Sequence, residues 1–346
     1  MLTFYNEHHA QHRTRNSGSD GMALRRDAPE RAELVLAELQ RRGLGEIVTP
    51  HRVPLVSLER VHSPRYLHFL RSAWSEWTAL APGNAGKDAF PSNWPIRTMR
   101  SDIEPDSFAG RLGLYSMDST TPLTAGTWNA AKTGADCAIN AAHALRLGER
   151  GSFALTRPPG HHAGFDFLGG GCYLNNAALA AQHLLDDGLK RVAILDLDRH
   201  HGNGSQGIFY NRGEVLCVSI HADPRGDYPY FVGHADETGD GDGQGHNMNL
   251  PLAQGSDAQD WMAALETACI KLGMAAPEAL VVALGVNTAA SEPGGGFGLQ
   301  GADFLRIGER IAWLGLPTVF VFEGGQAGSE LGINTVNVLE GFETAA

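Results

Sequence analysis

The strongest constraint on the fold of this chain is the alternation of apolar runs with helical patterns beyond about residue 125. Segments with helical spacing cover 176–189, 258–274 and 302–315. Such alternation predicts an α/β protein with a central, mostly parallel sheet that helices cover on both faces. The runs with the length and composition of buried strands are SFALT (152–156), RVAILDL (191–197), VLCVSIH (215–221), ALVVALG (279–285) and TVFVF (318–322).

Two features of the N-terminal half complete the predicted organisation. A helix is expected after Pro29, which suits a first turn, and it should end at Gly43. Residues 81–122 are rich in Pro, Gly, Asp and Ser without periodicity, which predicts a long excursion serving as an active-site rim or an oligomer contact. We find neither repeats nor a linker, so we predict a single domain over residues 1–346.

The charge balance and the hydropathy pattern exclude several function classes. With 27 basic and 39 acidic residues the net charge is −12, which disfavours a nucleic-acid partner and suits a cationic substrate. No apolar stretch is long enough for a membrane span, and the N-terminus lacks the pattern of a secretory signal. The cysteines form no C-x-x-C pair, which favours buried thiols in a cytoplasmic protein: Cys137, Cys172, Cys217 and Cys269.

Polar groups gather where the predicted strands end, which is the edge where parallel α/β sheets bind ligands. Asp198 and His200, two apart in LDLDRHHGNG, point the same way in extended chain and can share one metal ion. His161 and His162 follow a rigid Pro-Pro-Gly turn, and paired imidazoles suit the proton transfers of metal-assisted hydrolysis. Taken singly, each pair is also compatible with ordinary capping or hydrogen-bonding roles.

Several long motifs, in order, carry a family resemblance: RPPGHHAG, GGGCYLNNAALAA, VAILDLDRHHGNGSQGIFY, SIHADP, ALGVNT and FEGG. Together they resemble the zinc-dependent deacetylase family, and most of all its bacterial acetylpolyamine amidohydrolase branch. The likeness extends over nearly the whole chain. It implies the three-layer arginase–deacetylase fold, with the 81–122 excursion as a dimer-forming insert, a homodimer, and a small acylated amine or amide as substrate.

The resemblance also assigns residue roles. Asp198 and His200 become zinc ligands, with His161 and His162 as the catalytic histidines; Asp196 would orient His161, and Asn203 would orient His162. Tyr228 matches an aromatic wall of the substrate tunnel, and the Gly170 carbonyl matches a substrate contact. Two structural potassium sites are implied, the first with Asp196, Asp198, His200, Ser219 and Ile220, and the second with Phe209, Arg212 and Val215.

Five departures from the family pattern surround the same pocket. The third zinc ligand of the family is an aspartate, and here it is Asn287. The family's transition-state tyrosine is replaced by Gln326, whose amide could still donate to an oxyanion. A tunnel aromatic is Gly171, which means either a wider tunnel or a repacked loop. The residue between the first two ligands is Arg199, and an acidic residue tied to polyamine selectivity falls near Thr120, although Glu104 retains another.

These departures leave more than one function open. Zinc on Asp198, neutral His200 and Asn287 would carry a formal charge of +1 instead of zero, which predicts weaker zinc binding and a more acidic bound water. We favour a zinc-dependent amidohydrolase with an altered pocket and low activity. The alternatives are a catalytically impaired relative that binds or senses a small molecule, and an acyl or ester transfer in the same pocket. An arginase-type dinuclear manganese site is disfavoured, because Asn203 and Asn287 stand where acids would help.

Overall fold

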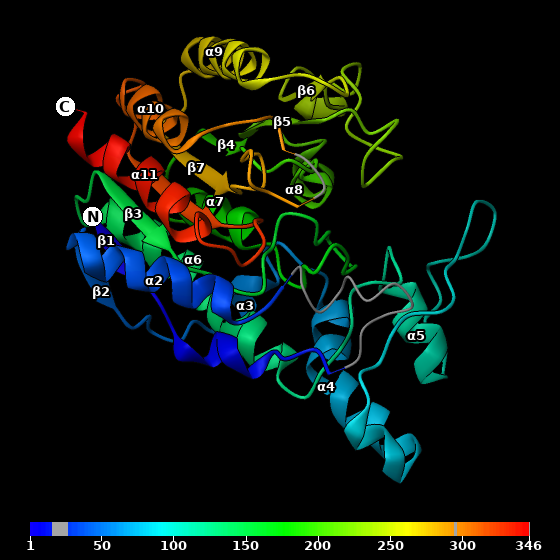
Figure 1. Ribbon diagram of the computed structural model, residues 1–346. Coiled ribbons are helices and arrows are strands. Elements are labelled where there is room, and N and C mark those ends of the chain that lie inside the picture. Colours follow the sequence, from blue (N-terminus) through cyan, green and yellow to red (C-terminus); the bar gives the residue numbers. More distant parts are fainter. Residues whose placement is uncertain (16–26, 294–295, 346) are drawn as a thin grey trace.

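The computed structural model describes residues 1–15, 27–293 and 296–345. Within these residues eight strands form one sheet in the order β2-β1-β3-β8-β7-β4-β5-β6, and every neighbouring pair is parallel (Figure 1). The strands are β1 (Leu2–Phe4), β2 (Glu46–Val48), β3 (Gly151–Ala154), β4 (Val192–Asp196), β5 (Val215–Ala222), β6 (Asn247–Leu252), β7 (Ala279–Leu284) and β8 (Thr318–Phe322).

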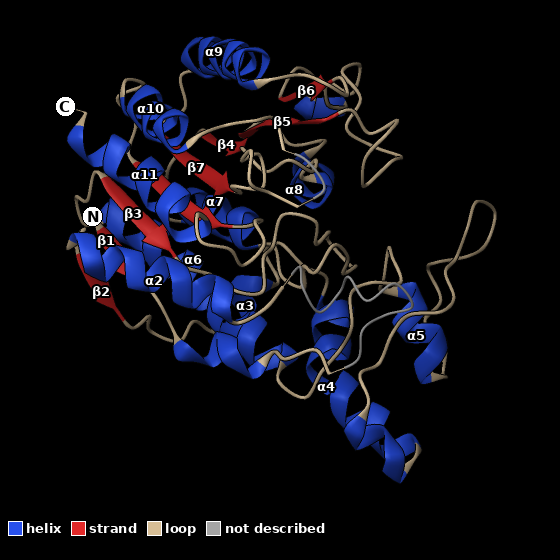
Figure 2. Ribbon diagram, viewed as in Figure 1, coloured by secondary structure: helices blue, strands red, loops and turns tan. Residues whose placement is uncertain are grey.

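Helices cover both faces of this sheet (Figure 2). One face packs mainly against α6 and α7, and the other packs against α2, α9, α10 and α11. The helices are α2 (Glu30–Arg42), α3 (Leu55–Leu58), α4 (Pro64–Leu80), α5 (Phe108–Leu114), α6 (Thr127–Arg146), α7 (Asn176–Asp186), α8 (Asn203–Phe209), α9 (Ala258–Ala275), α10 (Gly301–Ala312) and α11 (Leu331–Thr344), with short 3₁₀ turns at η1 (Glu7–Gln11), η2 (Pro82–Gly86) and η3 (Gly241–Gly243).

The central strands are apolar throughout because both of their faces are buried. In β4, Val192 and Ile194 belong to the core under α6 and α7, whereas Ala193 and Leu195 belong to the core under the opposite helices. Successive side chains of a strand point to opposite faces, so a strand buried on both sides has no polar positions. The polar residues therefore begin only where the strand ends, at Asp196.

The predicted mostly parallel sheet is confirmed, and each of the five predicted strands is present within two residues of its expected bounds. The predicted helix after Pro29 is also present, with Pro29 as its N-cap and Gly43 in the left-handed region at φ 64°. Strands β1, β2 and β6 were not predicted. The first two are only three residues long, and β6 is an edge strand interrupted by Pro251.

The excursion at 81–122 contains α5 and long loops that project away from the sheet (Figure 1). Its two ends are joined by an antiparallel bridge between Ala89 and Leu123. Tyr115, near the end of the excursion, accepts the N–H of Leu168 at its carbonyl at 2.9 Å. This hydrogen bond brings the excursion against the chain that follows the paired histidines. Among the described residues, none of the helices is both long and apolar enough to cross a membrane.

Candidate active site

The predicted site residues converge where four neighbouring strands end. His161 and His162 follow β3, and Asp196 closes β4. Asn287 follows β7, and Gln326 follows β8. These four strands are consecutive in the sheet as β3-β8-β7-β4, so their carboxyl ends share one edge. The structure thus places the polar groups where the parallel-sheet rule expects a ligand.

The paired histidines are buried and each is held by its own partner. His161 Nδ1 lies 2.9 Å from Asp196 Oδ2, and His162 Nδ1 lies 2.7 Å from Asn203 Oδ1. The two rings are close, with their centroids 3.9 Å apart. Since an amide oxygen only accepts, the Nδ1 of His162 carries the proton, and its Nε2 lone pair is free to act as a base.

The surrounding charges give the two imidazoles opposite protonation states. Burial lowers the pKa of His161, but the charges of Asp196 and Asp198 outweigh burial and raise it to about 10. Burial, together with the charges of His161 and His200, lowers the pKa of His162 well below its usual value. Near neutral pH, the pair therefore consists of one protonated and one neutral imidazole. Acid–base catalysis needs such a combination of a proton donor and a proton acceptor.

Asp198 and His200 form the two predicted metal positions on the β4–α8 connection. His200 Nδ1 lies 3.3 Å from Asp198 Oδ1, close to the separation of about 3.4 Å expected for two ligands of a tetrahedral zinc ion. The Asp198 carboxylate also accepts backbone N–H groups from His200 and Gly324, both at 2.9 Å. A Cβ at Gly324 would lie 2.1 Å from Asp198 Oδ2, so the glycine permits this close approach.

Asn287 reaches the third position, but its amide presents the wrong atom. Its Nδ2 donates to Asp198 Oδ1 at 2.7 Å and lies 3.5 Å from His200 Nδ1. Its Oδ1 accepts the backbone N–H of Arg199 at 2.8 Å. Turning the amide over would offer oxygen to a cation, but it would set Nδ2 against the Arg199 N–H, donor against donor. The donor set thus fits a divalent cation at Asp198 and His200, and at Asn287 only at the cost of that hydrogen bond.

Gln326 lies on the same edge, half-buried, in the loop after β8. Its backbone N–H faces both oxygens of Glu292, at 3.2 and 3.3 Å, and burial raises the pKa of that carboxyl. The buried Arg31 of α2 donates to the carbonyls of Glu323 and Gly325 and so fixes the backbone of this loop. Arg31 and Glu292 were missed from the sequence, because both act on backbone atoms and belong to no side-chain motif.

A second buried acid, Glu323, supports the histidine turn. Its Oε2 accepts the backbone N–H groups of Gly160 at 2.6 Å and of His161 at 3.1 Å. Burial raises its pKa to about 7, although the charge of His161 opposes that shift. Glu323 was visible in the FEGG motif, but the sequence alone gave it no role.

Asp118, which sequence reasoning also missed, joins Tyr228 and Gly170, the two residues that the resemblance matches to substrate contacts. Asp118 Oδ2 accepts the Tyr228 hydroxyl at 2.8 Å and the Gly170 N–H at 2.6 Å. Tyr228 stands edge-on to His162, with a centroid distance of 5.0 Å. Asp118 lies two residues before Thr120, within the excursion, so an acid does approach the site from this segment.

Gly170 and Gly171 have different surroundings. A Cβ at Gly170 would lie 2.2 Å from Cδ2 of His162, so this position must be glycine for the histidine to keep its place. A Cβ at Gly171 would meet nothing within 4 Å. The space beside Gly171 is therefore open, and the wider tunnel and the repacked loop both stay predictions.

Two other predicted residues have partners of their own. Glu104 accepts the Tyr115 hydroxyl at 2.7 Å and faces Arg111 at 3.9 Å, so within the described chain its contacts stay in the excursion. Arg199 forms an ion pair with Asp227 at 2.7 Å. The other oxygen of Asp227 lies 3.7 Å from Nε2 of His200, so Arg199 brings an additional acid beside the metal position.

Of the residues predicted to hold potassium, Asp198 and His200 belong to the site itself, and the others lie in two further places. Asp196 and Ser219 are paired across β4 and β5, next to Ile220, and both line a small cavity shared with Asn247 and Asn249. Phe209, Arg212 and Val215 lie in the connection from α8 to β5, where the Arg212 N–H donates to the Phe209 carbonyl at 3.0 Å.

Two groups of three His, Cys or acidic side chains, among the described residues, are close enough to hold a metal ion. The first is buried and consists of His161, Cys172 and Glu323; burial raises the pKa of Cys172 well above its usual value, so its thiol is protonated. The second lies at the surface and consists of His143, His183 and Asp187. Neither group contains Asp198 or His200, since the third partner of that pair is an amide.

A parallel sheet between two helical layers, with paired histidines and an Asp-x-His at its carboxyl edge, defines the arginase–deacetylase class of α/β proteins. Comparison with known proteins agrees. A solved structure of acetylpolyamine aminohydrolase from Burkholderia pseudomallei matches with a TM-score of 0.93 and 38% identity over 100% of this chain and 99% of that one. The HD domain of HDA15 has a TM-score of 0.82 at 23% identity and shares the fold, over 98% of this chain and 87% of that one.

The sequence comparisons are more specific. Residues 25–341 match the histone deacetylase domain model. Acetylpolyamine amidohydrolase 1 of Pseudomonas aeruginosa is 50% identical over 100% of both chains, and acetylpolyamine amidohydrolase of Mycoplana ramosa is 42% identical over 91% of each. The chain belongs to the histone deacetylase domain family, whose members are generally zinc-dependent, and these relatives are hydrolases of amide bonds.

Proposed function

We propose that this protein hydrolyses the amide bond of a small acylated amine, with a metal site weaker than that of its relatives. The observation that carries this proposal is the pair of buried histidines, each with its own partner, His161 with Asp196 and His162 with Asn203. Their ring centroids lie 3.9 Å apart, beside Asp198 and His200. Buried ionic groups are costly to maintain. Their retention together, with opposite protonation states, supports a role in proton transfer.

The chain's own residues divide the proton transfers between them. Neutral His162 accepts a proton at Nε2 from the attacking water, whose oxygen forms the new bond to the acyl carbon. Protonated His161 places positive charge beside the developing oxyanion, and the proton held at Nε2 of His162 passes to the departing amine as the C–N bond breaks. Asp198 and His200 would hold the metal, with Asn287 as a neutral third ligand, and the metal would supply Lewis-acid polarisation of the acyl carbonyl.

A cationic amine is the substrate class that the surroundings support. The chain carries a net charge of −12, and Asp118 bonds both Tyr228 and Gly170, the two residues matched to substrate contacts. Named relatives of this chain act, by their names, on acetylpolyamines. The open space beside Gly171 supports a pocket wider than that of the relatives, which would suit an acyl group bulkier than acetyl.

Potassium, dimerisation and a cytoplasmic location remain part of this proposal. The pairing of Asp196 with Ser219 beside a small cavity, which Asn247 and Asn249 also line, supports the first potassium position. Exposed apolar side chains on the excursion, Ile96, Met99 and Ile103, are each between 58% and 61% exposed and support a homodimer contact there. Sedimentation of the purified chain measures its oligomeric state, and a monomer at micromolar concentration would contradict the proposed homodimer.

One observation favours a second candidate, a relative that binds acylated amines without turnover. The Asn287 amide directs its N–H₂ toward both Asp198 and His200, and a donor group in that place opposes cation binding. In that case, the pocket would retain ligand recognition through Tyr228 and Asp118 while lacking a metal.

Zinc content and turnover decide between the two candidates. The full chain is purified without chelator, its zinc is measured, and hydrolysis of acetylputrescine and of an acetyl-lysine peptide is assayed. Turnover that needs zinc and disappears in His162→Ala establishes the hydrolase. Binding of acetylputrescine without turnover under zinc-replete conditions, together with activity gained by combining Asn287→Asp and Gln326→Tyr, overturns it in favour of the binding protein.

A further inference from the structure

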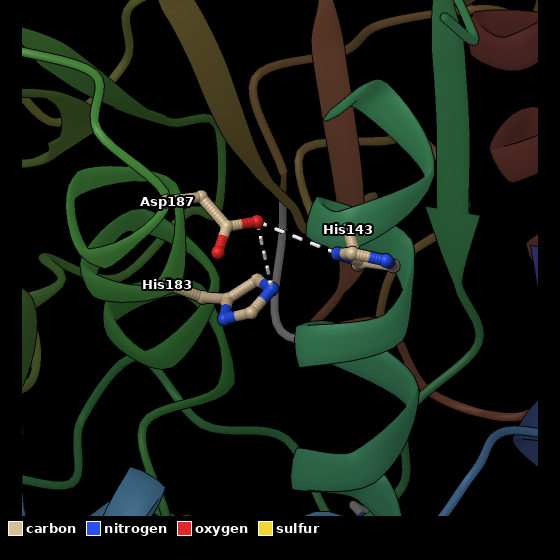
Figure 3. Close-up of side chains that lie close together, drawn as sticks. All are labelled: His143, His183 and Asp187. Atoms are coloured by element: carbon tan, nitrogen blue, oxygen red, sulfur yellow. Dashed lines mark hydrogen bonds and ion pairs between the residues drawn. The ribbon is translucent and has the colours of Figure 1, made fainter. Parts of the chain in front are cut away.

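The surface group His143, His183 and Asp187 lies on the helical layer formed by α6 and α7 (Figure 3). His143 is in the last turn of α6, while His183 and Asp187 are four residues apart at the end of α7. These helices lead into β3 and β4, so their C-termini lie at the amino edge of the sheet. The catalytic residues lie at the carboxyl edge, so the two places are at opposite ends of the strands.

The distances within this group suit a shared metal ion better than hydrogen bonds. One oxygen, Asp187 Oδ2, is 3.4 Å from His143 Nδ1 and 3.4 Å from His183 Nε2. Hydrogen bonds from nitrogen to oxygen are shorter, at about 2.7–3.2 Å. A tetrahedral zinc ion with ligands at about 2.0–2.2 Å separates its donor atoms by about 3.4 Å. The three donor atoms all lie within 4.8 Å of one another.

Two further features of this group favour the binding of a cation. Nε2 of His183 is buried and has no hydrogen-bond partner in the described chain, although it points at Asp187 (Figure 3). The C-terminal ends of α6 and α7 converge here, and each carries partial negative charge that Asp187 reinforces. The adjacent Asp186 pairs with Arg60 at 3.0 Å, whereas the Asp187 carboxylate faces the two histidines.

We propose that His143, His183 and Asp187 bind a divalent transition-metal ion, of which zinc is the natural example, and that this ion clamps α6 to α7. Two imidazoles and one carboxylate are a donor set that zinc accepts readily. The His143 side chain is 54% exposed, so water completes the coordination sphere. The site is structural, because it lies away from the catalytic edge and joins two helices that cover one face of the sheet.

The test uses the untagged full chain, with zinc as the probe. Zinc is titrated calorimetrically into the wild type and into His143→Ala, Asp187→Asn and a control, His68→Ala, which removes an exposed histidine of α4. We expect one zinc equivalent at this site, in addition to any bound at the catalytic edge, and its affinity should fall at least about tenfold in the first two variants. Loss of a direct ligand costs no less than loss of a group that supports one. The control should titrate like the wild type.

Anomalous diffraction at the zinc edge then locates the ion. A peak between α6 and α7, absent in crystals of His143→Ala, supports the site whether or not the catalytic edge binds zinc or turns over substrate. If zinc titrates identically in all variants, or the anomalous signal is confined to the catalytic edge, the proposal is wrong. Circular dichroism of each variant shows that the fold is intact, so that loss of binding reports the ligands themselves.

Discussion

Replacement of Asn287 by Asp probes the departure that most affects the candidate metal centre. In the wild type, Nδ2 of Asn287 donates to Asp198 Oδ1 at 2.7 Å, so the two side chains attract each other without a metal. In Asn287→Asp an oxygen takes the place of that nitrogen, and two buried carboxylates then face each other. We therefore expect the variant to depend on zinc for its stability, which the wild type does not.

The size of the effect follows from this distance. Two unit charges 2.7 Å apart repel by about 6 kcal/mol at an effective dielectric constant of about 20. The pair can escape by sharing a proton, which at pH 7 costs about 4 kcal/mol for a carboxyl of ordinary pKa. The smaller of these two free energies is therefore the expected loss of stability in Asn287→Asp. With an unfolding entropy of about 2.1 cal/mol/K per residue over 346 residues, about 4 kcal/mol corresponds to a fall in Tm of about 5–6 °C.

Scanning calorimetry of chelator-treated and zinc-loaded protein measures this penalty. The metal-free variant should melt about 5 °C below the metal-free wild type at pH 7, and the difference should shrink toward pH 5, where the shared proton costs less. Zinc should restore the Tm of the variant, and the variant should bind zinc more tightly than the wild type does. Asn287→Ala, which loses the same hydrogen bond without gaining charge, serves as the matched control. Equal stability of metal-free wild type and variant at pH 7 would refute the assigned orientation of the Asn287 amide.

Three further outcomes are expected. Introducing Gln326→Tyr into the Asn287→Asp variant should raise kcat for acetylputrescine by about 10²-fold, measured at saturating zinc, because a phenol at this position would donate to the oxyanion of the proposed hydrolysis. Glu323 has a folded pKa of about 7, above the unfolded value of 4.5, so the stability it contributes is present below pH 4.5 and is lost as the pH rises through 7. The free energy of unfolding of the wild type should therefore fall by about 3 kcal/mol between pH 4.5 and pH 8, measured by urea unfolding, and this fall should be absent in Glu323→Gln. Asp118→Asn should raise KM for a cationic acylated amine about fivefold, the value of a partly exposed ion pair, without a comparable change for a neutral acylated amine.

The sequence predicted the parts of the fold in which local pattern and burial coincide. Strands β4, β7 and β8 are apolar on both faces, so their runs are continuous and their ends are marked by polar residues. The edge strands could not be recognised in the same way. β1 and β2 contribute only three residues each, and their pairing is decided by distant segments of chain.

The site was predictable where roles belong to side chains in motifs, and not where they depend on geometry. The contacts of His161 with Asp196 and of His162 with Asn203 agree with the roles implied by the family resemblance. The direction of the Asn287 amide was not predictable, because it is set by a backbone N–H that no pattern reveals.

The exchange at residue 287 alters the charge balance of the whole site. Without metal, the carboxylates of Asp196 and Asp198 share the protonated imidazole of His161, and the remaining charge on Asp198 is solvated by backbone N–H groups, by His200 at 3.3 Å and by Asn287 itself. An aspartate at 287 would add a second uncompensated charge that only a cation or a proton could neutralise. The amide therefore stabilises the metal-free state by the same contact that should weaken metal binding. A hydrolase built in this way should gain activity as free zinc rises, over a range where a three-ligand site is already saturated.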